Sequence, residues 1–71
     1  MLKITRKTEY ALIALKHLQM NSNNLISAKE ISNKYLIPKQ LLAKILQQMS
    51  KLNYINAIQG VYGGYRINTN L

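Results

Sequence analysis

The chain has 71 residues, no cysteine and a formal net charge of +8, from ten lysines and arginines against two acidic residues. A sequence of this length makes one domain with a small core, predicted over residues 1–71. The lack of cysteine excludes disulfides and any iron–sulfur cluster bound through cysteine in this sequence, and no cofactor is expected. The basic excess favours polyanionic partners, such as nucleic acid or anionic lipid.

The first predicted helix runs from a cap at Thr5 to about Met20. Apolar residues recur along it at helical spacing, and Leu12 and Ile13 widen the apolar surface beyond one stripe. Such a helix either runs through the middle of a small core or packs on a second partner as well as on its own domain. His17 lies inside the apolar run, and we expect a packing or surface residue there, not a metal ligand or a catalyst.

The second predicted helix has a strong start signal. A polar turn over residues 21–24 precedes a very short strand at 25–26. Ser27 and Glu30 then have the spacing of a capping box, in which each side chain satisfies a backbone N–H near the helix start. The helix is expected to run from Ala28 to about Tyr35.

Pro38 suits the first position of a third helix and disfavours helical geometry in the residue before it. Only residues 36–37 remain for the turn, so the two helices meet at a sharp angle, as in a helix-turn-helix. The third helix is predicted over residues 38–52. Its buried face is expected to consist of Leu41, Leu42, Ile45, Leu46, Met49 and Leu52.

The opposite face of this third helix is polar and carries no carboxylate. Gln40, Lys44, Gln47 and Lys51 align along it, with Lys39 and Ala43 beside them. Glutamine can form bidentate hydrogen bonds with adenine, and lysine can reach guanine or a phosphate. The second helix of a helix-turn-helix is the one that enters the major groove. Because exposed helix faces are usually polar, a solvated face without a ligand is the alternative.

A glycine-rich turn follows. All three glycines lie between residues 60 and 64, which predicts a tight, exposed turn. Strand-favouring residues flank it, namely Tyr54, Ile55 and Ile58 before, and Tyr65 and Ile67 after. The predicted fold is therefore mainly α with a small β-hairpin: a winged helix-turn-helix with three helices and a wing over residues 59–66.

Several function classes are disfavoured. Only Glu9 and Glu30 carry carboxyl side chains, no catalytic set can be placed, and no Gly-Lys-Ser/Thr follows the glycines, so we expect neither an enzyme nor a P-loop. No apolar run approaches the ~20 residues of a membrane span, and the start lacks a signal-peptide core, so a cytoplasmic protein is expected. The scattered lysines argue against binding to a membrane surface.

The sequence resembles the Rrf2-type bacterial transcription regulators. Three segments carry the resemblance: residues 3–12 (KITRKTEYAL), residues 31–46 through the helix-turn-helix, and Gly60-x-x-Gly63-Gly64-Tyr65. The resemblance implies a winged-helix DNA reader that acts as a dimer on an inverted repeat. It also implies that the helix from Pro38 enters the major groove and that the hairpin tip touches the minor groove. Several members of the family sense iron–sulfur status, nitric oxide or cysteine supply.

The chain also departs from the family pattern. Members usually continue into a long dimerisation helix, and the sensing members carry a cysteine cluster near it. The sensory function therefore does not carry over, and any homodimer is expected to be weak or induced by DNA. Gln59 stands where many members have arginine, the favoured residue in a narrow minor groove, which predicts weaker binding there. Leu36 stands where many have glycine, and is expected to strain or reshape the turn.

We expect double-stranded DNA as the partner, with no membrane involved. The residues predicted to contact DNA are Arg6, Lys7, Lys29, Lys39, Gln40, Ala43, Lys44, Gln47, Gln59, Gly60, Tyr62 and Arg66. The alternative is a winged-helix protein-interaction module that binds its partner through the apolar first helix.

Overall fold

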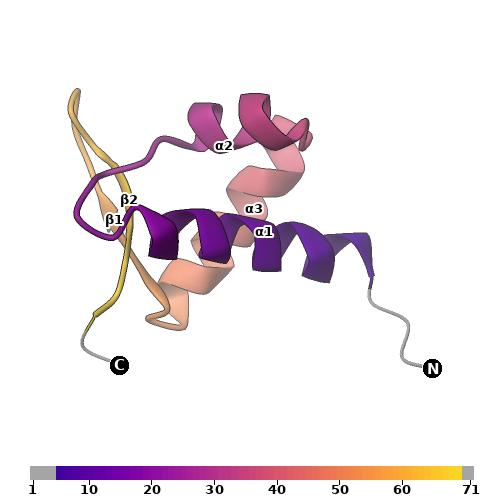
Figure 1. The fold of residues 1–71 in the computed structure, drawn as a ribbon, viewed down its shortest axis with the longest axis horizontal. Coiled ribbons are helices and arrows are strands. Elements are labelled where there is room, and N and C mark those ends of the chain that lie inside the picture. The colour runs from indigo at the N-terminus through magenta and orange to yellow at the C-terminus, as the bar shows by residue number, and fades with distance from the viewer. Residues whose placement is uncertain (1–4, 70–71) are drawn as a thin grey trace.

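Three helices and a two-stranded antiparallel hairpin make up residues 5–69, the part of the chain that the computed structural model describes (Figure 1). The predicted architecture of a helix-turn-helix followed by a wing is confirmed. The elements are α1 (Arg6–Met20), α2 (Ala28–Tyr35), α3 (Lys39–Lys51), β1 (Ile55–Ile58) and β2 (Gly64–Ile67). The ends of the predicted 1–71 domain, and the first residues of the 3–12 segment, lie outside the described residues.

Side-chain caps fix where α1 and α2 begin. The Thr5 hydroxyl accepts a hydrogen bond from the Thr8 N–H at 3.2 Å, and the Ser27 hydroxyl accepts one from the Glu30 N–H at 3.0 Å. Each cap satisfies a backbone donor that the helix itself cannot pair. The other half of the predicted capping box is wrong, because the Glu30 carboxylate bonds His17 instead of the Ser27 backbone.

His17 ties α1 to both ends of α2. Its side chain is buried, with Nε2 at 3.0 Å from Glu30 Oε2 and Nδ1 at 2.9 Å from Tyr35 Oη. A carboxylate can only accept, so Nε2 donates to Glu30, and in the neutral ring Nδ1 accepts from the Tyr35 hydroxyl. Because Glu30 lies in the first turn of α2 and Tyr35 is its last residue, the imidazole fixes the position of the whole helix. Of the predicted alternatives, a packing or a surface residue, the structure shows the packing one.

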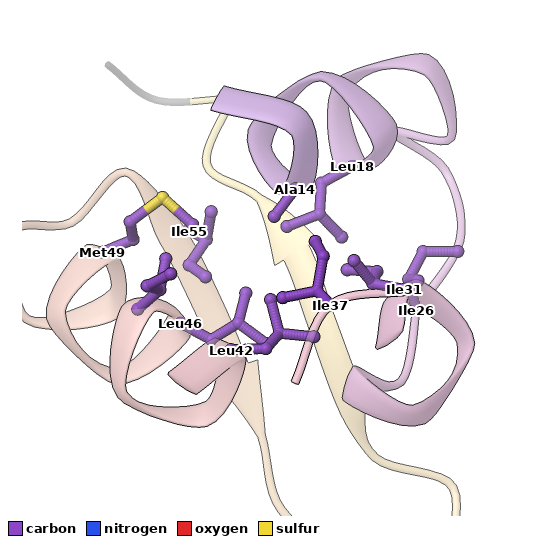
Figure 2. Close-up of a cluster of buried hydrophobic side chains, with 10 residues drawn as sticks. Ala14, Leu18, Ile26, Ile31, Ile37, Leu42, Leu46, Met49 and Ile55 are labelled. Atoms are coloured by element: carbon purple, nitrogen blue, oxygen red, sulfur yellow. The ribbon is translucent and has the colours of Figure 1, made fainter. Parts of the chain in front are cut away.

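Every helix contributes to one apolar core. In Figure 2 the side chains of α1, α2, α3 and the turn between α2 and α3 point toward one another. The buried apolar residues are Ala14, Leu18, Ile26, Ile31, Ile37, Leu42, Ile45, Leu46, Met49 and Ile55. Burial of each large aliphatic side chain contributes about 1.5–3 kcal/mol relative to exposure.

Leu52 does not belong to this core, contrary to the prediction. It is 63% exposed and stands as the C-cap of α3. The helix ends at Lys51, and Asn53 follows with a φ of 66°, which turns the chain away from the helical path. The buried apolar face of α3 therefore ends at Met49, and the helix itself ends one residue before the predicted end at Leu52.

One side of α1 packs on the core, and the other faces outward. Ala14, His17 and Leu18 are buried, and Ile13 packs partly against the core. Leu12 is 55% exposed. Between the two arrangements left open by the sequence, the structure therefore excludes a helix running through the middle of the core and leaves apolar surface on α1 uncovered by the described chain.

The hairpin is attached to the helices through Ile26. Ile55 pairs with Ile67 and Ile58 with Gly64 across β1 and β2. Ile26 and Tyr65 exchange two backbone hydrogen bonds, of 2.9 and 2.8 Å. The strand predicted at 25–26 is therefore a single bridge, because Ser27 already caps α2 and leaves no room for more.

The turn between α2 and α3 holds an unfavourable backbone conformation. Leu36 is the C-cap of α2, with a φ of 56° in the left-handed region, and its side chain is exposed. Buried Ser32 holds Ile37 on both sides, since its hydroxyl donates to the Ile37 carbonyl at 2.7 Å and its own carbonyl accepts the Ile37 N–H at 3.1 Å. The prediction that Pro38 is the first residue of α3 is wrong: with a ψ of 129° it stands at the N-cap position, and the helix begins at Lys39.

We predict that Leu36→Gly stabilises the domain. A left-handed conformation costs a residue with a Cβ about 1–2 kcal/mol, and glycine escapes this cost but loses about 0.5–1 kcal/mol through backbone entropy. The free energy of unfolding, measured in urea, should rise by roughly 0.5–1 kcal/mol. Asn53→Gly is the matched control: Asn53 has a φ of 66°, but asparagine tolerates this region, so little change is expected. Equal or lower stability of Leu36→Gly would mean that the turn is unstrained.

Candidate nucleic-acid interface

The outward face of α3 carries the predicted polar residues on one exposed surface. Gln40, Ala43, Lys44 and Gln47 line a single open hollow together with Leu41. The amide and ammonium groups are exposed, whereas Ala43 is partly buried between its longer neighbours. Lys39, also predicted, lies exposed at the first position of the helix. The surface formed by Lys39 and the five residues that line this hollow is called the α3 face below.

A second hollow joins the C-terminal half of α3 to the hairpin. It is lined by Gln47, Ser50, Lys51, Ala57, Gln59 and Tyr65. Gln47 lines both hollows, so the predicted wing residue Gln59 lies on a surface continuous with the α3 face. This proximity arises because Ala57 and Tyr65 are paired across the hairpin and project on the side that faces α3.

The tip of the hairpin is fixed by glycines. The Gly63 N–H donates to the Gly60 carbonyl at 3.0 Å, which closes a four-residue turn. Gly60 has a φ of 119°, and a Cβ on Gly63 would collide with the Ile58 carbonyl oxygen. Two large side chains occupy the centre of this turn and stand out in solvent, Val61 at 94% and Tyr62 at 91% exposure. Turn centres usually hold small or polar residues, so this apolar tip has no structural explanation within the described chain.

The remaining predicted residues outside the hairpin tip are exposed but line neither of these two hollows. Arg6 and Lys7 lie at the start of α1, and Lys7 lines a separate hollow with Gln48 and Leu52. Lys29 lies in the first turn of α2. Arg66 pairs with Asn56 in the hairpin, one residue from Tyr65, so it projects from the side opposite to α3. The structure therefore gathers the α3 face and Gln59 but does not bring Arg66 to them.

The hollows are also lined by residues that were not predicted to contact DNA, namely Leu41, Ser50, Lys51, Ala57 and Tyr65. Ser50 lines the hollow between α3 and the hairpin, and its spacing of i, i+4, i+7 with Ala43 and Gln47 could have identified it. Val61 shares the exposed tip with Tyr62. Val61 is identified only by the extent of its exposure in the folded structure, which cannot be predicted from the sequence alone.

The electrostatics of the surface are one-sided. The two acidic residues are Glu9, in the first turn of α1, and Glu30, which bonds the buried His17. Neither lines the hollows of α3, whereas Lys44 and Lys51 do. The α3 face and the hairpin beside it therefore present positive charge and neutral hydrogen-bonding groups, a combination that suits a phosphate-bearing partner.

The donor groups do not fit a metal centre. No group of three or more His, Cys, Asp or Glu residues gathers anywhere in residues 5–69, and the sequence has no cysteine. Both nitrogens of the single histidine are already hydrogen bonded. In the same described region, α1, α2 and α3 are all too short or too polar to cross a membrane.

Comparison with known proteins relates the chain to transcriptional regulators. The family Rrf2, described as an iron-dependent transcriptional regulator, matches residues 4–71. The HTH-type transcriptional regulator NsrR of Bacillus licheniformis is 39% identical over 67 residues, which are 93% of this chain and 47% of that protein. The iron dependence belongs to the family description, and the donor groups described above supply no iron site here.

Solved structures share the fold. CymR, the global cysteine regulator of B. subtilis, superposes with a TM-score of 0.90 at 26% identity, over 97% of this chain and 54% of CymR. A viral Zalpha domain bound to left-handed Z-DNA gives a TM-score of 0.77 at 18% identity, over 99% of this chain and 100% of that domain, which shows the fold alone. This chain spans about half the length of NsrR and of CymR.

Proposed function

Since this chain belongs to the Rrf2 family of transcriptional regulators, we propose that it binds specific sequences of double-stranded DNA, with α3 in the major groove and the hairpin tip at the minor groove. Family members are regulators and not enzymes. The observation that supports the proposal most directly is the carboxylate-free α3 face, continuous with Gln59 of the hairpin. Glutamine and lysine at these positions match the donors and acceptors of base edges and phosphates.

The hairpin tip has the chemistry of a minor-groove contact. Val61 and Tyr62 stand exposed on a turn that Gly60 and Gly63 fix. Apolar and aromatic side chains lose little by entering a groove walled by sugars, and proteins that bind the minor groove often use such residues. Gln59, close to the tip, supplies a neutral amide at a position where an arginine would add charge.

The proposed function also implies where the protein acts and whether DNA binding needs a cofactor. A regulator that binds the bacterial chromosome acts in the cytoplasm, and we place the protein there. We further propose that DNA binding by these 71 residues needs no iron or iron–sulfur cluster, because their donor groups do not fit one.

We propose that two copies bind one DNA site, through a contact that is weak in solution or formed only on DNA. Leu12 on α1 is 55% exposed. Leu52 is also exposed, and together with Met49 it lines a groove between α1 and α3. Exposed apolar residues of this kind favour an interface. DNA with two-fold symmetry makes the second binding event local, so even a feeble contact between copies gives cooperativity.

Selection of bound sites from random duplex DNA tests the function and the symmetry together. We expect a selected motif with two half-sites about one helical turn apart, and sedimentation should give two protein copies per duplex. A selected motif without symmetry, bound by one copy, would remove the dimer. The exposed α1 surface also supports a second candidate, a protein-interaction module. Failure to enrich any motif, together with salt-insensitive capture of a protein partner, would favour it.

Substitutions on the α3 face should weaken sequence-specific binding. Gln40→Ala and Lys44→Ala each remove one side chain that can reach a base edge or a phosphate, and each should cost about 1–3 kcal/mol of binding to the selected duplex. Gln19→Ala, an exposed glutamine on α1, is the control and should bind like the parent. Fluorescence anisotropy gives the affinities, and circular dichroism checks the fold. Parental affinity in both α3 variants would show that α3 does not read the site.

A charge added beside the wing should strengthen contact with the DNA backbone or the minor groove. Gln59→Arg should tighten binding and make the slope of log affinity against log salt steeper by roughly one unit. Gln19→Arg adds the same charge at an exposed position in the last turn of α1, which lines neither hollow of the α3 face and the hairpin, and should leave the slope nearly unchanged. If the two variants show the same slope as the parent, the wing lies clear of the DNA.

A further inference from the structure

The α3 face has a small apolar residue, Ala43, at its centre. Ala43 carries the only short side chain in the hollow, between Gln40 one turn before, Gln47 one turn after, and the adjacent Lys44. These neighbours are exposed and extend outward, whereas Ala43 is partly buried. Leu41 also lines the hollow, so a ligand that fits this surface presents apolar groups to Ala43 and Leu41 and polar groups to the glutamines and Lys44.

Within the major groove, one base carries an apolar group of this size. Thymine presents its C5-methyl there, beside the donor and acceptor of its partner adenine, and alanine is a side chain that contacts this methyl. Glutamine is suited to adenine, so Gln40 and Gln47 match the A·T pairs on either side of such a contact. Reading cytosine directly would favour a carboxylate, and neither Glu9 nor Glu30 lines this hollow.

We propose that Ala43 receives the C5-methyl of one thymine in each half-site and thereby distinguishes thymine from uracil and cytosine at that position. The inference rests on the proposed function, because it requires α3 to lie in the major groove. It adds a residue that sets specificity and the base that the residue reads. Lys44, which is long and flexible, contacts a neighbouring phosphate or guanine in this arrangement.

The test removes single methyl groups from the DNA. Each thymine of the selected duplex is replaced in turn by deoxyuridine, which lacks only the methyl group, and the dissociation constant is measured. We expect replacement of one particular thymine per half-site to weaken binding about fourfold, the effect of losing one buried methylene-sized group. Replacement of the other thymines should change the affinity little. Replacing the same pair by C·G and by 5-methyl-C·G should show the methyl gain again, with the methylated duplex bound more tightly.

Variants of Ala43 assign the effect to this side chain. In Ala43→Gly and Ala43→Ser the thymine-to-uracil ratio at that position should fall toward one. Because each ratio compares two duplexes on the same protein, a loss of stability from glycine in a helix does not alter it. Ala28→Gly, the same methyl deletion at the first residue of α2, is the control and should keep the parental ratio.

The outcomes separate this inference from the proposed function. If the selected site is bound and Gln40→Ala weakens it, but no thymine responds to loss of its methyl group, the reading of Ala43 is overturned and α3 remains the recognition helix. If a thymine responds equally in the parent and in both Ala43 variants, another residue receives the methyl and the reading is also overturned. If no duplex sequence is preferred at all, the proposed function fails and this inference fails with it.

Discussion

The position of α2 depends on one buried imidazole. His17 bonds the first turn of α2 through Glu30 and its last residue through Tyr35, so a single side chain of α1 holds α2 at both ends. An unpaired imidazole at this depth would cost about 1–3 kcal/mol for each group left without a partner, which makes the paired arrangement strongly preferred. Once α2 is placed, Ser32 holds Ile37 with two hydrogen bonds, and Ile37 enters the core beside Leu42. The angle at which α3 leaves the turn follows from these contacts, and with it the direction of the α3 face.

The stability of the small core also offsets a strained backbone conformation in the turn between α2 and α3. The Leu36 side chain is exposed and gains nothing from burial, and its left-handed backbone conformation is disfavoured for a residue with a bulky side chain. Leu36 keeps this conformation because the chain is fixed before and after it: Ser32 is held within α2, and Ile37 is held in the core. Strain of about 1–2 kcal/mol is a sizeable share of the 5–15 kcal/mol that stabilises a typical domain. Preserving the geometry of the helix-turn-helix therefore takes precedence over local stability in this part of the chain.

Local signals in the sequence predicted most of the fold. Ser27 and Thr5 were identifiable as caps because a cap depends on residues three positions away, and the glycines marked the hairpin because their backbone needs are local. The pairing of Glu30 with His17 could not be predicted, since the two are 13 residues apart and meet only through tertiary packing. Leu52 was misplaced because the helical spacing continues through it, whereas the end of α3 is decided by the turn at Asn53. For the interface, spacing predicted the α3 face, but only the folded hairpin brings Gln59 to the same surface as Gln47.

In the proposed DNA complex, α3 and the hairpin have different roles because they carry different chemical groups. Lysines spread over several elements supply attraction to phosphates that is independent of sequence and sensitive to salt. The α3 face adds amides and a methyl group, which distinguish base pairs but contribute little long-range attraction. In the same complex, Gln59 and the exposed tip add no charge, so the wing contributes shape and contact area. In this proposed complex, specificity resides in a few side chains of α3, while affinity is distributed over the whole basic surface. A rise in salt should therefore lower the affinity for all duplexes together and leave the ratio between a preferred and a non-preferred duplex much less changed.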